Sequence, residues 1–84
     1  MQAKIILICN LLNFRDKNFL IDLGLRIKVI RKSKKLSQED LAYEQNISLS
    51  QIARIETGKL NPTICTLKKI ADGLSVDVFE LLKF

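Results

Sequence analysis

The strongest constraint on the fold is a set of helix start and end signals within residues 37–58. Ser37 precedes the first segment, and Asp40 follows three residues later, in a spacing close to the capping box. This pattern predicts a helix that runs to about Gln45. Asn46 comes next, and asparagine is one of the few residues that tolerates the left-handed backbone of a tight turn. The chain is therefore expected to turn sharply at this point.

A second short helix follows this turn almost at once. Ile47 is apolar and is expected to anchor the turn in the core, while Ser48 with Gln51 three residues later forms another reciprocal capping pattern. Gly58 supplies the left-handed residue that ends the helix. Two capped helices joined by about three residues are typical of the helix-turn-helix unit.

The segment before this unit also has a helical pattern. Leu23, Ile27 and Ile30 recur at helical spacing and predict a helix over about residues 20–34. Its other faces are basic, and no acidic residue occurs between Arg26 and Lys35. The basic residues are Arg26, Lys28, Arg31, Lys32, Lys34 and Lys35.

A fourth helix is expected to begin at Asn61-Pro62-Thr63. Proline suits the first turn of a helix, because the N–H that it lacks has no helical partner there. The expected buried stripe of this helix is Ile64, Leu67, Ile70, Ala71 and Leu74.

A last short helix is predicted near the C-terminus, where Asp77 and Glu80 form one more capping pattern. Its apolar residues are Val78, Phe79, Leu81 and Leu82. The sequence thus predicts an all-α domain of five helices over residues 19–84, with no room for a fused ligand-sensing domain.

Residues 1–18 are expected to form an N-terminal arm ahead of this domain, with polar residues 15–18 at the boundary. The apolar run at residues 5–12, broken by Asn10, is far shorter than the ~20 residues of a membrane-spanning helix. No small-residue cleavage site of a signal peptide follows it. A strand, a helix, a dimer contact and an adventitious extension from an upstream start codon all remain open as interpretations of this arm.

The composition argues against an enzyme. The chain has 84 residues, a net charge of +5 and no histidine, which removes the commonest general base. It contains no glycine-rich phosphate loop, and Cys9 and Cys65 lack the spacing of a metal or redox motif. We expect no cofactor or metal, reduced cytosolic thiols and a cytoplasmic location. The positive charge favours an anionic partner, either nucleic acid or an acidic membrane surface.

The helix after the turn has two contrasting sides. Ile52 and Ile55 lie 60° apart on a helical wheel and define the inward side. The opposite side is small and polar around a single arginine, with Leu49 at its edge; it consists of Ser50, Ala53, Arg54 and Thr57. Such a helix fits the DNA major groove, where arginine can bind guanine O6 and N7 in bidentate fashion. An ordinary solvated helix face is the alternative interpretation.

Glu56 lies only about 40° from Ile52 on the same wheel, close to the inward side. A buried carboxylate is costly unless it is paired. Arg31, at the end of the first predicted helix, is the best candidate for its partner.

Residues 20–83 resemble the Cro/C1-type (XRE) helix-turn-helix family, and are similar to small phage repressors and restriction–modification controller proteins. The resemblance is carried by LSQEDLA, by I-x-R-I-E-x-G-K-x-N-P and by the closing VDVFELL. It implies a five-helix fold in which the second and third helices read DNA, and a homodimer on a pseudo-palindromic operator.

The resemblance also implies residue roles. The positions that match base contacts are Leu49, Ser50 and Arg54. The positions that match contacts near the DNA backbone are Gln38, Gln51, Thr57 and Lys59, and Gln38 would also brace the reading helix. Arg31 and Glu56 match a buried ion pair between the first and third helices.

The chain departs from the family pattern at four positions. Gln45 replaces an apolar residue, Asn46 replaces a glycine in the turn, and Gly73 stands where a helix former is common. Leu49 is apolar where a polar reader is frequent. The first three departures bear on stability, and the last leaves the operator sequence open.

The function that follows is a sequence-specific transcriptional regulator that binds double-stranded DNA as a homodimer, without a membrane or a small-molecule ligand domain. An antitoxin-like protein-interaction module of the same fold is the alternative from another class. Binding to a membrane surface through residues 4–35 is disfavoured, because no helix there places Trp or Phe on one strongly amphipathic face.

Overall fold

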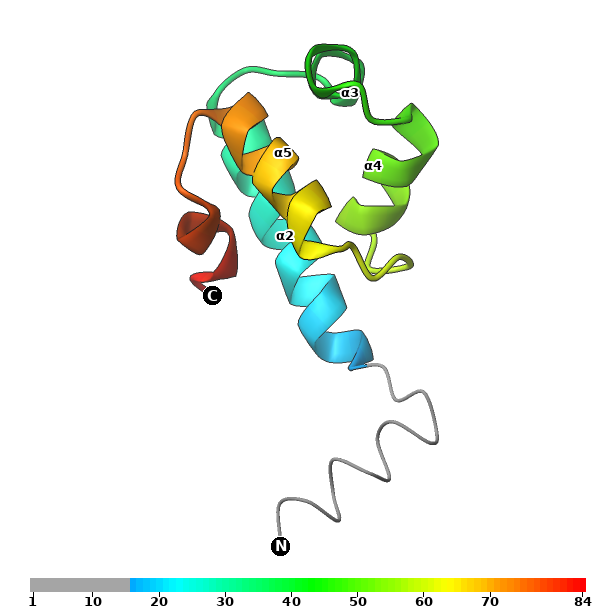
Figure 1. Cartoon of the computed structure of the whole chain (residues 1–84). Helices are drawn as coiled ribbons and strands as arrows, with labels where there is room; N and C mark the ends of the chain where they lie inside the picture. Colours follow the sequence, from blue (N-terminus) through cyan, green and yellow to red (C-terminus); the bar gives the residue numbers. More distant parts are fainter. Residues whose placement is uncertain (1–15) are drawn as a thin grey trace, which may run out of the picture.

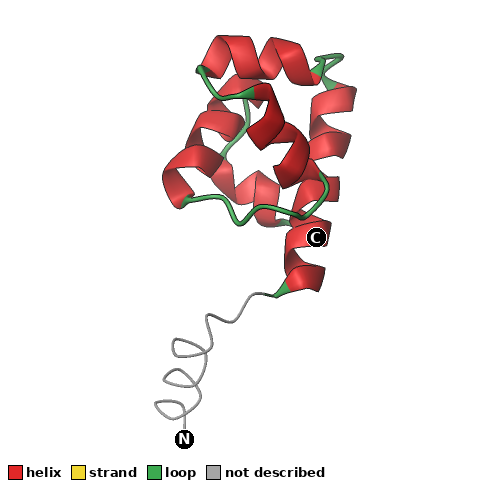
Figure 2. Ribbon diagram, turned by 90° about the vertical axis from the view of Figure 1, so that its right-hand side faces the viewer, coloured by secondary structure: helices red, strands yellow, loops and turns green. Residues whose placement is uncertain are grey.

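The computed structural model describes residues 16–84, in which four α-helices and one 3-10 helix surround a single core (Figures 1 and 2). These elements are α2 (Lys17–Ser33), α3 (Gln38–Gln45), α4 (Leu49–Glu56), α5 (Ile64–Leu74) and η1 (Val78–Leu82). The expected all-α architecture is confirmed, but the fifth element is a 3-10 helix, not an α-helix. The predicted N-terminal arm lies mostly outside the described residues.

Helix α2 is the longest element, and α4 and η1 pack against it, whereas α3 packs against α4 and α5 (Figure 1). It begins at Lys17, three residues earlier than expected, because the Asp16 carboxylate accepts a hydrogen bond from the Phe19 N–H at 3.0 Å. The predicted stripe of Leu23, Ile27 and Ile30 is buried. The residues predicted as a polar break therefore include the cap and first turn of α2.

Helices α3 and α4 have the predicted caps. Ser37 and Asp40 form a complete capping box, with both hydrogen bonds between 2.9 and 3.0 Å. Asn46 adopts the left-handed conformation, with φ of 53°. Ser48 accepts from the Gln51 N–H at 3.1 Å, but the hydrogen bonds of residues 16–84 do not include the expected return bond from the Gln51 side chain.

The capping box predicts a pH dependence of stability. The backbone hydrogen bond from Ser37 holds the pKa of Asp40 below its ordinary value. This stabilisation is present above the unfolded pKa of about 3.9 and is lost as the pH falls through the lower folded pKa. Asp40→Asn should therefore be less stable than wild type near neutral pH, and the difference should shrink below about pH 4. Thermal melts from pH 7 to acid would show this, and a constant difference would contradict it.

The second half of the domain differs from expectation in two details. Thr63 is the N-cap of α5, accepting from the Thr66 N–H at 3.1 Å, so Pro62 lies before the cap and not in the first turn. Ile64 is 67% exposed, because it is the first residue of α5 and precedes the turns that meet the core. The remaining predicted stripe is buried, and it consists of Leu67, Ile70, Ala71 and Leu74.

Element η1 closes the core with Leu81, and the half-buried Val78 packs against the same cluster. Leu81 is fully buried, whereas Phe79 is 69% exposed. The Asp77 carboxylate accepts from the Phe79 N–H, and the Glu80 N–H bonds to the Asp77 carbonyl three residues back. This i to i+3 pattern and the length of five residues explain why the segment is a 3-10 helix.

Two of the departures from the family pattern, Gly73 and Gln45, lie against each other. A Cβ atom at Gly73 would lie 2.8 Å from Gln45 Cγ and 2.4 Å from a methyl group of Leu41. The glycine in α5 thus leaves the space that the Leu41 and Gln45 side chains of α3 occupy. A glycine inside a helix costs up to ~1 kcal/mol relative to alanine. The close packing of α3 against α5 explains why a glycine stands here despite this cost.

Gly24 brings α2 and α4 into backbone contact. A Cβ atom there would lie 2.4 Å from the Ile55 carbonyl oxygen and 2.5 Å from that of Glu56. Real Cβ atoms do not come this close to another atom, so any larger residue must push α4 away from α2.

Gly24→Ala should therefore lower the free energy of unfolding by ~1–3 kcal/mol, the usual cost of overpacking, despite a propensity gain of roughly 1 kcal/mol. Urea unfolding measures this. Gly73→Ala is the matched control, because its new methyl group meets side-chain atoms of Leu41 and Gln45 and no backbone atom, and it should lose less. A Gly24→Ala protein as stable as wild type would contradict the close contact.

No helix in residues 16–84 combines the length and hydropathy that crossing a membrane requires.

Candidate nucleic-acid interface

Helix α4 presents the small polar side that the sequence predicted. Its inward residues, Ile52 and Ile55, are each 1% exposed. On the other side Ser50, Arg54 and Thr57 are exposed, and Ala53 is half-buried. No segment of residues 16–84 covers this side, so a large surface could approach it closely.

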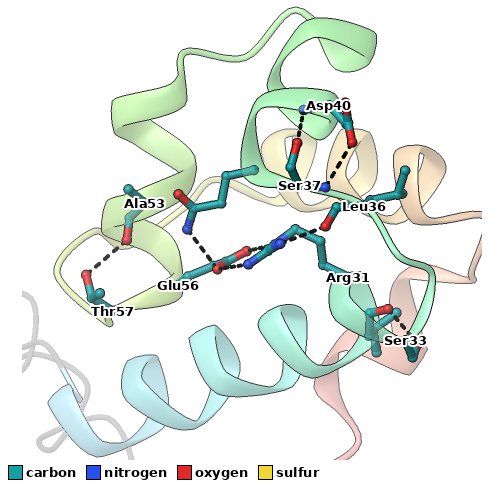
Figure 3. A network of polar contacts seen from close by, with 10 residues as sticks. Arg31, Ser33, Leu36, Ser37, Asp40, Ala53, Glu56 and Thr57 are labelled. Carbon is teal, nitrogen blue, oxygen red and sulfur yellow. Dashed lines mark hydrogen bonds and ion pairs between the residues drawn. The ribbon is translucent and has the colours of Figure 1, made fainter.

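A buried ion pair joins this helix to α2 (Figure 3). Arg31 Nε donates to Glu56 Oε2 at 2.7 Å, and Arg31 Nη2 donates to Glu56 Oε1 at 3.0 Å. The side chains are 8% and 2% exposed. The hydrogen bonds to Glu56 raise the pKa of Arg31 above its ordinary value, so the guanidinium of this bidentate pair stays charged.

The ion pair extends into a network that fixes three elements together. Gln38, the first residue of α3, donates from Nε2 to Glu56 Oε1 at 2.9 Å. Arg31 Nη1 donates to the Leu36 carbonyl oxygen at 2.7 Å, in the turn between α2 and α3. Every buried side-chain N or O atom in residues 16–84 has a partner. The exposed side of α4 therefore stands on a rigid, fully satisfied support.

Gln38 has one amide hydrogen left after this contact. A side-chain amide has two N–H bonds, and only one is used by Glu56. The residue is half-buried at the start of α3. The position assigned to a phosphate contact thus also holds α4 in place from α3.

The other predicted site residues lie on or next to the outer side of α4. Leu49 and Ser50 are exposed in its first turn, and Gln51 is half-buried beside them. Lys59 is exposed just beyond the helix end, where its N–H donates to the Arg54 carbonyl at 2.8 Å. These residues therefore lie at the two ends of the exposed side of α4.

Thr57 differs from the others because its hydroxyl is already used. Its Oγ1 donates to the Ala53 carbonyl oxygen at 3.0 Å, the contact drawn in Figure 3. The hydroxyl oxygen can still accept a hydrogen bond, but donation to a phosphate requires the side chain to give up this contact.

The positive charges of this surface are not neutralised within the domain. The ion pairs of residues 16–84 involve neither Arg54 nor Lys59. The same holds for Lys34 and Lys35, which are exposed in the turn before α3. The surface can therefore attract an anionic partner at long range.

The sequence analysis missed Gly24, which sets the α2–α4 distance and hence the position of the exposed side. The available signal was a glycine inside an apolar helical pattern, which costs about 1 kcal/mol relative to alanine and therefore indicates a packing requirement.

A family model described as helix-turn-helix (HTH_3) matches residues 27–81, more than half of the chain. The chain belongs to the helix-turn-helix family. In this helix-turn-helix protein, α3 and α4 form the unit that gives the family its name, and the resemblance to the XRE type is confirmed.

The relatives of this helix-turn-helix protein include a phage repressor and restriction–modification controllers. The immunity repressor of Bacillus phage phi105 is 45% identical over 59 residues, which cover 70% of this chain and 41% of the repressor. The chain thus spans less than half of that protein. Control protein C.MunI from Mycoplasma sp is 37% identical over 62 residues, which cover 73% of this chain and 84% of the control protein.

Solved structures of controller proteins have the same fold. The restriction–modification controller protein C.AhdI from Aeromonas hydrophila aligns with a TM-score of 0.73 at 32% identity, covering 74% of this chain and 94% of C.AhdI. The controller protein C.Esp1396I, solved as a tetramer with its natural 35-base-pair operator, aligns with a TM-score of 0.72 at 38% identity, covering 80% of this chain and 92% of that one.

Proposed function

We propose that this helix-turn-helix protein is a sequence-specific DNA-binding transcriptional regulator that reads a two-fold symmetric operator as a homodimer. The observation that carries the proposal is the uncovered side of α4, small and polar around Arg54, on a rigid buried support. The operator complex of the related controller protein C.Esp1396I supports the same reading.

Base recognition is assigned to the first turns and middle of α4. Arg54 is the principal reader, since its guanidinium can bind guanine O6 and N7 together in the major groove. Ser50 donates to a base edge, and Leu49, 44% exposed, contacts a thymine methyl group. The half-buried Ala53 lets the helix approach the bases closely.

Contacts to the DNA backbone are assigned to residues around the reading helix. Gln38 donates its remaining amide hydrogen to a phosphate from the start of α3, and Lys59 binds a phosphate beyond the end of α4. Gln51 and Thr57 complete this set. Such contacts position the protein and supply affinity without reading sequence.

A homodimer would place two α4 helices in successive major grooves, about 34 Å apart along B-DNA. The symmetry of the protein would then appear in the DNA site, as two inverted half-sites.

Selection of binding sites from a random DNA pool tests the proposal. We expect a two-fold symmetric consensus. The dissociation constant for this site should be on the order of 10³- to 10⁷-fold lower than for unrelated DNA at the same salt concentration. Enrichment of no sequence, with retention governed by salt alone, would show a non-specific basic protein and would contradict the proposal.

A further inference from the structure

Two shallow hollows lie beside α2, near the C-terminal residues. The larger, about 420 Å³, is lined by the apolar residues Leu25, Val29 and Phe84 and by the charged residues Asp22, Arg26 and Lys83. The smaller, about 220 Å³, lies between the start of α2, the loop before α5 and η1, and its lining includes Phe19 and Leu82. Neither hollow includes a residue of the proposed DNA-reading side of α4.

The two hollows form one continuous surface. The rings of Phe19 and Phe84, one from each hollow, pack with their centroids 5.2 Å apart. We call this surface the α2 apolar face, and define it as Phe19, Leu25, Val29, Leu82 and Phe84. These five side chains are between 39% and 61% exposed. A contiguous patch of large apolar side chains on a small domain indicates a site that another apolar segment covers.

We propose that residues 5–12 of the same chain bind to the α2 apolar face. This segment, IILICNLL, is apolar apart from Asn10, and residues 5–14 carry no charge. Only residues 13–15 separate it from Asp16, the N-cap of α2. Asp16 also lines the smaller hollow, so the segment is tethered at the edge of its binding site.

The tether is long enough to reach the larger hollow. Leu25 lies nine positions after Asp16, about 13–14 Å along α2 at 1.5 Å per residue. The four residue steps from Leu12 to Asp16 span up to ~13–14 Å. Val29, about 20 Å along the helix, is within the ~23–25 Å that the seven steps from Cys9 can span.

The chain's own segment is favoured over a second copy because it is tethered to the face. A short tether gives an effective concentration of about millimolar, which a second molecule reaches only at that total concentration.

Disulfide trapping tests this proposal with a cysteine that the segment already contains. In a Val29→Cys protein that also carries Cys65→Ser, Cys9 and the new thiol are the two cysteines of the chain. The matched control is Lys28→Cys in the same Cys65→Ser background. Lys28 is also exposed on α2 and lies one position nearer to Asp16, but its side chain points about 100° away from that of Val29.

Under mild oxidation without DNA, we expect the Val29→Cys protein to form a Cys9 disulfide within one chain, several times faster than the Lys28→Cys control. The rate should be unchanged by an about ten-fold dilution, as for any tethered reaction. Equal rates for the two positions, or disulfide-linked dimers that weaken on dilution, would overturn the proposal. Because the assay contains no DNA, its outcome is independent of the proposed regulatory function.

Discussion

Replacing Glu56 with alanine should lower the free energy of unfolding by ~3–5 kcal/mol, the range for breaking a buried ion pair on one side. Arg31 would then remain buried with an uncompensated charge, and Gln38 would lose the acceptor of its 2.9 Å hydrogen bond. For a domain of this size such a loss is a large part of the total stability. Urea unfolding followed by circular dichroism measures it.

The matched control for this loss is an exposed ion pair. Lys68 Nζ lies 2.6 Å from Asp72 Oδ1, and the two side chains are 63% and 52% exposed. Asp72→Ala should change stability by no more than about 1 kcal/mol, the usual limit for a surface pair. If Glu56→Ala and Asp72→Ala melted at the same temperature, the network between α2, α3 and α4 would not be the support inferred here.

Replacing Arg54 with alanine should weaken binding to the selected operator by ~1–3 kcal/mol, or about 5- to 150-fold in the dissociation constant. The fold should be unaffected, because Arg54 is exposed and makes no ion pair within residues 16–84. Binding to random DNA should fall much less, and the preference at one operator position should relax. Fluorescence anisotropy on both kinds of DNA measures the difference.

Lys59→Ala provides the comparison for Arg54→Ala. A phosphate contact is lost equally on every sequence, so this variant should weaken binding to operator and random DNA by similar factors and reduce the salt dependence. Arg54→Ala losses of equal size on both kinds of DNA would show that Arg54 is only another phosphate contact.

Local signals predicted most of the fold. The two serine caps, the left-handed Asn46 and Gly58, and the buried isoleucines of α4 depend on interactions within a few residues, which the sequence displays directly. The helical wheel predicted that Ile52 and Glu56 both point inward. In the structure Glu56 is paired with Arg31, 25 positions away in the chain.

The features that the sequence did not predict depend on how elements meet. Gly24 is a glycine because two carbonyl oxygens of α4 lie where its Cβ would be, and this distance is set by tertiary packing. Ile64 is apolar and has the helical spacing of the buried stripe. It is nevertheless exposed, because Thr63 caps α5 and makes Ile64 its first residue. Thr57 was assigned a phosphate contact, while its hydroxyl donates to the end of its own helix.

The central claim is that the outer side of α4 reads bases in the major groove, and methylation interference on the selected operator tests it most directly. Dimethyl sulfate methylates guanine N7 in the major groove and adenine N3 in the minor groove. We expect methylation of one symmetric pair of guanines to abolish wild-type binding, and Arg54→Ala to become indifferent to that pair. Interference confined to adenine N3, or an identical pattern for both proteins, would contradict the claim.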